Sequence, residues 1–347
     1  MDRFVGREDA LRALNLGLAS GHHVFLMGPV GTAKTSLVRA WAEAQGMSFF
    51  SHLLTAFTVP EEVFGPLDLA ALKEGRLVRR VQGFLPTAEV AFLDEVFKAS
   101  SEILNTLLQV MQERVFAVEP PQARPVPLRV LVGASNELPG DSSLAALYDR
   151  FLLRVHVQYL PDAEFRAMLR GEGQAPSRVE LPGRVEDVRV GDDVIDAVVA
   201  IRQALRKEGI VPSDRRFKQG LDVVRAQALL RGSDLAEAFD CEVLTMVLWD
   251  KPEQRPVVDE VVLRAVCPEM EELRALAAEM EAAYAQLDLN DASKTFEYAS
   301  RLTTAIKRMG ALVERIPAAH RDGARSKVEA LRALHREITV ERLGLGV

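Results

Sequence analysis

The stretch that decides the fold is HVFLMGPVGTAKTS, which occupies residues 23–36. Its first part is apolar, its middle is a glycine-rich turn, and residues 36–44 then follow the spacing of a helix. A strand that feeds a helix through such a turn leaves the first backbone N–H groups of the helix without partners. Together with the positive end of the helix dipole, these groups form a binding site for phosphate. An ordinary turn is the alternative interpretation.

The turn and the start of this helix supply the candidate phosphate-binding residues. Lys34 is placed to reach the β- and γ-phosphates of a nucleotide, and the Thr35 hydroxyl is placed to bind Mg²⁺. A glycine usually precedes this lysine, and Ala33 stands there instead. We expect Ala33 to open the helix with a negative φ, which alanine adopts without strain. ATP and Mg²⁺ are therefore the expected cofactors, and the candidate residues are Gly28, Pro29, Val30, Gly31, Thr32, Ala33, Lys34, Thr35 and Ser36.

A second motif lies at residues 90–95, where an apolar strand ends in Asp94 and Glu95. Because ligands bind at the carboxyl ends of strands in a parallel sheet, both carboxylates are expected at the nucleotide. Asp94 is predicted to hold Mg²⁺ through water, and Glu95 is predicted to polarise the water that attacks the γ-phosphate. A third apolar run leads to Asn136, whose amide is a candidate for positioning the same water. Asparagine is also common in turns, so both interpretations of Asn136 stay open.

Composition places the chain among ordinary globular proteins. Of its 347 residues, 48% are hydrophobic and 27% are charged. No apolar run approaches the roughly 18 residues that span a bilayer, and no export signal is visible. These features predict a cytoplasmic protein without membrane insertion. Cys241 and Cys267 match no metal-ligand spacing and are expected to be buried thiols. The net charge of −7 argues against a protein that coats nucleic acid.

The pattern along the chain predicts an α/β core followed by helices. Between residues 4 and 182, short apolar runs alternate with helical patterns, which indicates a parallel sheet covered on both faces. Residues 174–184 contain prolines and glycine and are expected to form a linker. Helical patterns follow at 194–206, 215–230 and 235–248. We predict an α/β nucleotide-binding core at 1–183, an all-α lid at 184–268, and a C-terminal helical hairpin or bundle at 269–347.

The C-terminal region carries apolar stripes at helical spacing. The stripes include Leu273, Leu276 and Met280 in one segment, and Leu302, Ile306 and Met309 in the next. A third segment near residues 328–338 shows the same pattern. Such stripes form either the core of a helical bundle or the seam of a hairpin that docks a partner.

Six short segments carry a resemblance to a known family. They are FTVPEEVFGP at 57–66, FLDEVFKA at 92–99, ILNTLL at 103–108, ASNELP at 134–139, LYDRF at 147–151 and SDRR at 213–216. In this order they resemble the AAA+ superfamily and, more narrowly, the MoxR family and its RavA-like branch. MoxR proper usually has Asn-Arg where this chain has Phe97 and Lys98, which favours the RavA-like branch. The resemblance covers residues 4–267 and does not extend to the C-terminal helices.

This resemblance implies roles for residues outside the phosphate site. Arg150 matches the arginine finger, which reaches the nucleotide of the neighbouring subunit in a ring that is commonly hexameric. Arg215 matches the lid arginine that senses the γ-phosphate of its own subunit, although the adjacent Arg216 is an alternative. Val5 and Gly6 match the segment that lies against the adenine.

Two further segments match places where the family inserts structure. Residues 67–82 lie where related proteins carry an insert in the second helix of the core, and residues 116–128 are expected to form a hairpin. The prolines of that hairpin exclude it from a central strand. Either segment can contact substrate or be an inert surface loop.

The resemblance implies a chaperone-like ATPase that remodels or assembles a protein partner, commonly one with a von Willebrand factor A-type (vWA) domain. The motor subunit of a metal chelatase, or of a gas-vesicle assembly system, has a similar motif order and is the alternative. A nucleic-acid motor is less favoured because the chain is acidic and has few aromatic residues for base stacking. Stimulation of the ATPase by DNA, by a chelatase partner or by a vWA protein would discriminate among these functions.

Overall fold

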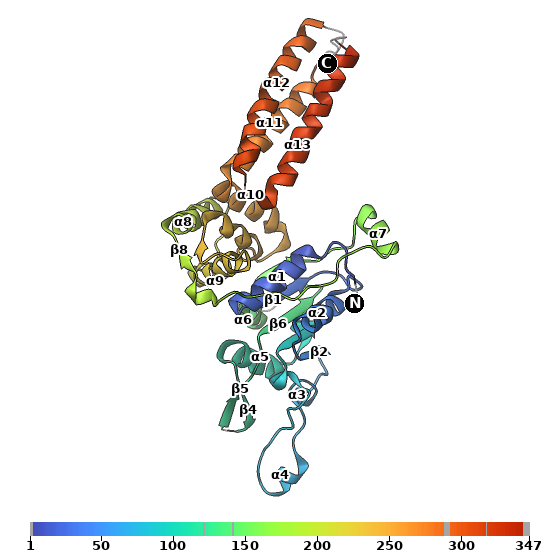
Figure 1. Cartoon of the computed structure of the whole chain (residues 1–347). Coiled ribbons are helices and arrows are strands. Elements are labelled where there is room, and N and C mark those ends of the chain that lie inside the picture. The colour runs from blue at the N-terminus through green and yellow to red at the C-terminus, as the bar shows by residue number, and fades with distance from the viewer. Residues whose placement is uncertain (1–2, 121, 141, 288–291, 317, 343–347) are drawn as a thin grey trace. The chain divides into compact units, whose positions relative to one another are not determined.

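The computed structural model describes residues 3–120, 122–140, 142–287, 292–316 and 318–342 (Figure 1). The backbone divides into two compact units that interleave along the sequence. The first unit combines residues 1–192 with 210–255, and the second combines 193–209 with 256–347. In the parts of the chain that the structure describes, no helix has both the length and the apolar character needed to cross a membrane.

The centre of the first unit is a five-stranded sheet with the strand order β2-β3-β6-β1-β7. All its neighbouring strands run parallel, so their carboxyl ends lie along one edge of the sheet. The predicted parallel sheet is therefore confirmed. Its strands are β1 (His23–Met27), β2 (Phe49–Leu53), β3 (Val90–Asp94), β6 (Val130–Ser135) and β7 (Phe151–His156).

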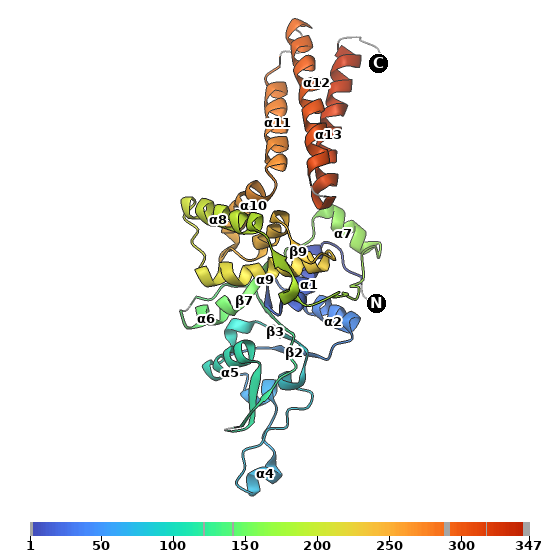
Figure 2. The same cartoon turned by 60° about the vertical axis from the view of Figure 1, so that its left-hand side comes forward.

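Helices cover both faces of this sheet (Figure 2). The helices α1 (Glu8–Ser20) and α2 (Lys34–Gln45) pack on one face, and α3 (Pro60–Phe64) and α5 (Ser101–Glu113) contribute to the core on the other. In α5 the buried residues Ile103, Leu107 and Val110 recur at three- and four-residue spacing, which turns one apolar side toward the sheet.

The rest of the first unit surrounds these layers. It contains α6 (Ser142–Arg150), α7 (Asp162–Leu169), β8 (Arg189–Val190), α9 (Asp214–Leu230), β9 (Leu235–Ala236) and a 3₁₀ helix, η4 (Ala238–Met246). The helix expected at 235–248 is therefore only partly confirmed: residues 238–246 are helical, but as a 3₁₀ helix, and residues 235–236 form a short strand. There the buried Asp240 accepts hydrogen bonds from the Glu237 backbone and from Arg231, which holds the chain in a tight turn instead of an α-helix.

The two insertions contact each other. The hairpin consists of β4 (Val115–Glu119) and β5 (Gln122–Pro125), which pair antiparallel and apart from the central sheet. The other insertion contains α4 (Leu69–Lys73). The Arg79 N–H donates to the Val118 carbonyl, and the Arg76 guanidinium lies 3.5 Å from Glu119. The two insertions are therefore held to each other within the first unit.

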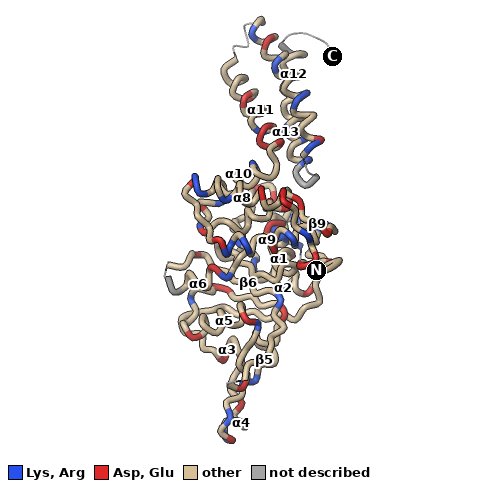
Figure 3. The backbone as a smooth tube through the Cα atoms, turned by 90° about the vertical axis from the view of Figure 1, so that its left-hand side faces the viewer, with Lys and Arg blue, Asp and Glu red and all other residues tan. Residues whose placement is uncertain are grey.

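The second unit is helical. It holds most of α8 (Asp192–Lys207) and α10 (Arg255–Val266), together with α11 (Pro268–Ala285), α12 (Ala292–Arg315) and α13 (Ala318–Arg336). The last three helices pack against one another, and their apolar stripes face the bundle interior. Figure 3 shows acidic residues along α11 and basic residues along α12 and α13. The ion pairs between α11 and α12 are Glu269–Arg315, Glu272–Arg308 and Glu279–Arg301 among the residues that the structure describes.

His23 at the start of β1 is a buried titratable group with both ring nitrogens in use. Its Nδ1 accepts from the Leu131 N–H at 3.0 Å, and its Nε2 lies 3.2 Å from the Met111 carbonyl. This arrangement requires the neutral ring with the proton on Nε2. Burial lowers the pKa of His23 well below its usual value, and the charge of Arg114 lowers it further.

We expect the free energy of unfolding to fall as the pH is lowered below about 6.5, by up to about 1.4 kcal/mol per pH unit. The native state keeps His23 neutral, whereas the unfolded chain takes up a proton there, so stability that is present above this pH is lost as the pH falls. Urea titrations between pH 8 and 5 measure the effect. A His23→Gln variant should lose most of this slope, whereas His52→Gln should keep it. Equal slopes in wild type and His23→Gln would contradict the assignment.

Candidate active site

The phosphate loop lies between β1 and α2, at the carboxyl edge of the sheet. The Gly28 N–H donates to the Ser135 carbonyl at 3.1 Å, which ties the loop to the end of β6. A Cβ on Gly28 would lie 1.9 Å from the Val157 carbonyl oxygen, so only glycine fits there. Gly31 has a φ of +84°, which favours glycine for conformational reasons. The turn that the sequence predicts is present.

The N-terminus of α2 carries no capping side chain. Its N-cap residue is Ala33, whose methyl side chain cannot accept a hydrogen bond, and no capping bond from another described residue is present. The N–H groups of that turn therefore remain available to an anionic ligand. Ala33 has φ +64° and ψ +24°, a left-handed conformation. The expectation of a negative φ is wrong, because the tight loop turns into the helix at this residue and needs the conformation that glycine adopts freely.

We expect Ala33→Gly to stabilise the protein by roughly 0.5–1 kcal/mol. The substitution removes a left-handed strain of about 1–2 kcal/mol, and the greater freedom of glycine in the unfolded chain offsets part of that gain. Chemical denaturation measures the change. The matched control is Ala44→Gly in the same helix, where φ is negative and the substitution should destabilise by up to about 1 kcal/mol. A change in the free energy of unfolding with the same sign in both variants would contradict backbone strain at Ala33.

Lys34 is the first residue of α2, and its side chain folds back onto the phosphate loop that precedes it. Its Nζ donates to the carbonyls of Gly28 and Pro29 at 2.8 and 2.9 Å. Burial lowers the pKa of Lys34, while the charges of Asp94 and Glu95 act in the opposite direction. The ammonium group therefore stands between the loop and the two carboxylates at the end of β3.

Glu95 has a left-handed backbone and a largely buried carboxylate. Its φ of +53° is left-handed, and its side chain is 13% exposed. One oxygen, Oε2, lies 3.3 Å from Lys98 Nζ but outside hydrogen-bonding geometry, and it is buried without a hydrogen-bond partner among the described residues. Non-glycine residues with strained backbones concentrate at functional sites. The neighbouring Asp94 carboxylate is fixed by a hydrogen bond from the Glu95 N–H.

The other residues predicted to lie at the carboxyl edge of the sheet differ in their exposure to solvent. Thr35 and Ser36 lie in the first turn of α2, where Thr35 is partly exposed. Asn136 directly follows β6 and is exposed, one residue after the Ser135 carbonyl that accepts from Gly28. Val30 is 74% exposed at the tip of the loop. The structure thus brings the loop, both carboxylates and Asn136 to one edge of the sheet.

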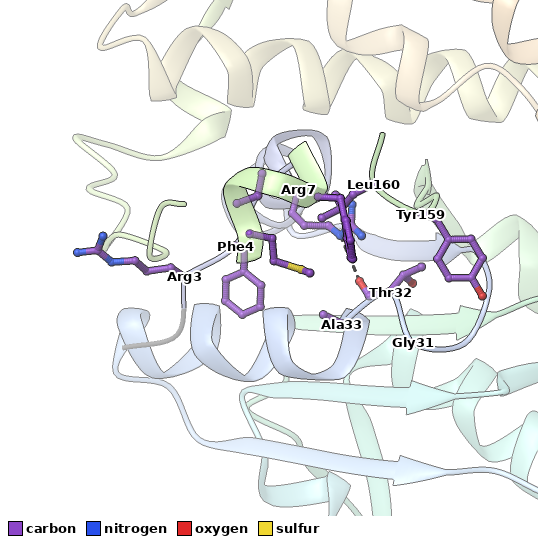
Figure 4. Close-up of a pocket in the computed structure, with 11 residues that line it drawn as sticks. Arg3, Phe4, Arg7, Gly31, Thr32, Ala33, Tyr159 and Leu160 are labelled. Atoms are coloured by element: carbon purple, nitrogen blue, oxygen red, sulfur yellow. Dashed lines mark hydrogen bonds between the residues drawn. The ribbon is translucent and has the colours of Figure 1, made fainter. Parts of the chain in front are cut away.

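An apolar pocket of about 500 Å³ opens beside the loop (Figure 4). Val5, which the resemblance places against an adenine, lines this pocket, whereas Gly6 lies in a separate polar depression next to Glu164. The Arg7 guanidinium donates to the Gly6 and Thr32 carbonyls, which ties the N-terminal segment to the phosphate loop. Further lining residues that the sequence analysis missed are Phe4, Tyr159, Leu160, Phe165 and Met168. Several of these residues come from α7 or the segment before it.

The sequence carries only a weak signal for α7, whose eight residues DAEFRAML include Phe165, Met168 and Leu169. In the structure none of the α7 side chains is buried, and these three apolar side chains are 43–68% exposed. An apolar surface on a short helix can cover a ligand, but no local pattern places this helix beside the loop. In the structure, two backbone hydrogen bonds join Phe4 to Gln174. They hold the segment that follows α7 against the N-terminal segment, beside the pocket. Pockets of this size and character suit a planar base.

Arg150 lies at the opposite edge of the sheet. It immediately precedes Phe151, which pairs with His23 at the amino end of β1. The five residues of β1 separate that end from the phosphate loop by roughly 17 Å. The Arg150 Nη2 donates to Gln112 at 3.0 Å, and its Nε is buried with no hydrogen-bond partner in the described part of the chain. Arg150 is therefore remote from the loop of its own chain.

The two adjacent arginines of α9 have different environments. Arg216 is 3% exposed and donates to the carbonyls of Val247, Phe151 and Leu152, so it is a structural residue. Arg215 is 47% exposed and lies 3.9 Å from Asp149. Its position beside Asp149 at the amino edge does not fit the expected contact with the γ-phosphate of its own subunit, because the loop lies at the other edge.

A magnesium ion fits the donors at the carboxyl edge. The Thr35 hydroxyl and the Asp94 carboxylate are hard oxygen donors, and Mg²⁺ usually combines one or two such ligands with waters and substrate phosphates. No group of three or more His, Cys, Asp or Glu side chains among the described residues could hold a metal by itself.

Comparisons with known proteins agree with this geometry. Residues 1–184 match a family described as the MoxR domain in the MoxR-vWA-beta-propeller ternary systems. Residues 193–262 match an AAA lid domain. The protein MJ0812 of Methanocaldococcus jannaschii, which is uncharacterized, is 40% identical over 259 residues, covering 72% of this chain and 68% of that protein. Chaperone MoxR1 of Mycobacterium tuberculosis is 29% identical over 180 residues, covering 51% of this chain and 47% of that protein.

A crystal structure of a proposed ATPase from Cytophaga hutchinsonii has a similar fold. It matches with a TM-score of 0.58 over 76% of this chain and 90% of that chain. At 20% identity this similarity concerns the fold alone. The predicted fold class, a P-loop AAA+ parallel-sheet core followed by a helical lid and C-terminal helices, is confirmed.

Proposed function

Because the chain belongs to the MoxR family of AAA+ ATPases, we propose that it hydrolyses ATP to ADP and phosphate with Mg²⁺. The observation that carries this proposal is the grouping of Lys34, Asp94 and Glu95 at the carboxyl edge of the sheet. Lys34 neutralises the β- and γ-phosphates, and the amides of the first turn of α2 bind their oxygens. Thr35 and Asp94 hold Mg²⁺, which neutralises phosphate charge, and Glu95 orients and polarises the attacking water. The apolar pocket receives the base.

We propose further that the protein acts as a homo-oligomeric ring, as the hexamers of related motors do. The support is the distance of Arg150 from its own phosphate loop, roughly 17 Å along β1. An arginine at that edge can reach a nucleotide only if a second subunit presents one. Arg215 lies at the same edge, so we assign it to the neighbour's nucleotide as well.

The partner we propose is a protein with a vWA domain. The support is the family description, which places the MoxR domain in systems with vWA and β-propeller proteins, together with the similarity to a MoxR chaperone. The activity is then chaperone-like remodelling or assembly of that partner. A Glu95→Gln variant retains bound ATP and is the form to use for isolating the partner by copurification. Copurification of DNA or of a chelatase subunit, without a vWA protein, would contradict this assignment.

We also propose the functional division of the chain into a core at 1–183, a lid at 184–268 and a C-terminal helical region at 269–347. The proposal rests on the family matches to residues 1–184 and 193–262. Phe97 and Lys98, where MoxR proper usually has Asn-Arg, support a place in the RavA-like branch. The insertion at 67–82 is assigned to contact with the partner, since α4 carries exposed leucines at positions 69 and 72.

The test of nucleotide binding is a Lys34→Ala variant. We expect it to bind a fluorescent ATP analogue at least roughly 10-fold more weakly, since hydrogen bonds to charged groups contribute about 1.5–3 kcal/mol. Lys73→Ala, which removes an exposed lysine from α4, is the matched control and should bind normally. Near-normal affinity in Lys34→Ala would show that residues 28–35 are not the nucleotide loop.

A further inference from the structure

Asp149 is a carboxylate that faces three arginines. Its Oδ1 accepts a hydrogen bond from Arg216 Nη1 at 3.3 Å. Its Oδ2 lies 3.8 Å from Arg150 Nη1 and 3.9 Å from Arg215 Nη1. One oxygen is therefore held by a buried arginine, and the other stands between the two arginines at the amino edge of the sheet.

The buried Arg216 fixes the direction of this carboxylate. Its other N–H groups donate to backbone carbonyls at the start of β7 and after η4, so the guanidinium has no freedom to turn. Burial lowers the pKa of Arg216 to about 10, which leaves it charged at neutral pH. The Asp149 oxygen that faces Arg150 and Arg215 thus has a defined position in the fold.

Arg150 and Arg215 carry like charges at close range. The positive charge of Arg215 adds to the effect of burial in lowering the pKa of Arg150, and the Asp149 carboxylate acts in the opposite direction. Without a negative charge between them, the two guanidinium groups would repel each other. The Arg150 Nη2 is also held by Gln112, while its buried Nε has no hydrogen-bond partner within the described ranges.

We propose that Asp149 is a positioning residue that holds Arg150 and Arg215 together as one arginine pair for the neighbouring subunit's nucleotide. This inference rests on the proposed function. Asp149 does not touch the nucleotide; it offsets the repulsion within the pair and fixes the spacing at which both guanidinium groups are presented. The γ-phosphate of the neighbour then replaces Asp149 as the anion that both arginines face.

The test is Asp149→Asn, which keeps the shape and the oxygen that accepts from Arg216 but removes the charge. We expect ATP binding within about two-fold of wild type and turnover lower by roughly 10- to 100-fold, because a displacement of about 1 Å at a reacting centre costs up to about 10²-fold. The defect should act across subunits. Adding Lys34→Ala subunits, which retain an intact Asp149 and Arg150, should restore part of the activity. In an Arg150→Ala background, Asp149→Asn should lower turnover by less than two-fold.

The matched control is Asp250→Asn. Asp250 pairs with Arg154, the other deeply buried arginine, at 2.5 Å, and among the described residues it forms no ion pair with Arg150 or Arg215. It should lose as much thermal stability as Asp149→Asn while keeping its turnover. Equal turnover losses in both variants, or a loss in Asp149→Asn that Lys34→Ala subunits do not relieve, would overturn the inference. A wild-type protein that binds no ATP would overturn the proposed function itself, whereas normal ATP hydrolysis in Asp149→Asn would overturn only the positioning role.

Discussion

Glu95→Gln should bind ATP as tightly as the wild-type protein and hydrolyse it roughly 10²–10⁴-fold more slowly. The amide keeps the volume of the side chain but cannot polarise the attacking water as a carboxylate does. Asp94 remains in place, with its carboxylate fixed by the residue-95 N–H, so the metal and the phosphates are still held. Rings that depend on bound ATP should therefore persist or become more stable.

Single-turnover hydrolysis and ATP binding, measured on the same preparation, separate the two effects. Glu102→Gln provides the matched control, because this glutamate is exposed in the first turn of α5 and should turn over ATP normally. Unchanged hydrolysis in Glu95→Gln would place the catalytic carboxylate elsewhere. A loss of ATP binding instead would mean that Glu95 shapes the phosphate site rather than acting on water.

Arg150→Ala should reduce turnover by roughly 10³–10⁵-fold, the range that arginine fingers from a second chain contribute. The guanidinium is planar and permanently charged, and it stabilises the charge on the equatorial oxygens of the transferred phosphoryl group. Because Arg150 lies roughly 17 Å from its own phosphate loop, the variant keeps an intact loop and impairs the site of its neighbour. Lys34→Ala has the reverse defect.

Mixing these two nearly inactive proteins should restore measurable ATPase activity, since some interfaces then combine a working loop with a working finger. The total ATPase activity of the wild-type protein should also rise more steeply than linearly with protein concentration. Gln112→Ala, which removes the group that holds Arg150 Nη2, serves as a milder comparison and should leave the loop intact. If light scattering shows that mixed rings form and no activity returns, Arg150 acts within its own chain or not at all.

Local chemistry explains why much of this protein could be predicted from its sequence. The apolar runs that end at Met27, Asp94 and Ser135 each form a strand of the parallel sheet, within one residue of the expected bounds. A phosphate loop needs only a strand, a glycine turn and a helix start, all contributed by one continuous segment. Glu95 follows its strand directly, so the carboxyl-end rule alone brings it to the loop.

Only the tertiary structure decided the features that depend on distant segments or on exact backbone angles. Ala33 has a positive φ because the loop turns sharply into α2 at this residue. The start of the loop is fixed in turn, since Gly28 packs against the Val157 carbonyl. The apolar pocket beside the loop is completed by Phe165, more than a hundred residues from the loop in sequence. No local pattern specifies such a contact, because it follows from how the chain returns over the sheet.

The same reason applies to the arginines. The resemblance predicts Arg150 as the arginine finger but leaves Arg215 and Arg216 as alternatives for the lid arginine. Two adjacent arginines match the same short motif, so the sequence cannot distinguish them. The fold separated them by burying Arg216 against β7 and leaving Arg215 exposed beside Asp149. It also put this group at the amino edge of the sheet, because β7 begins where α6 ends. The sequence by itself determined which chemical groups gather at the carboxyl edge of the sheet. The direction of the strands decided that Arg150 and Arg215 lie at the amino edge instead.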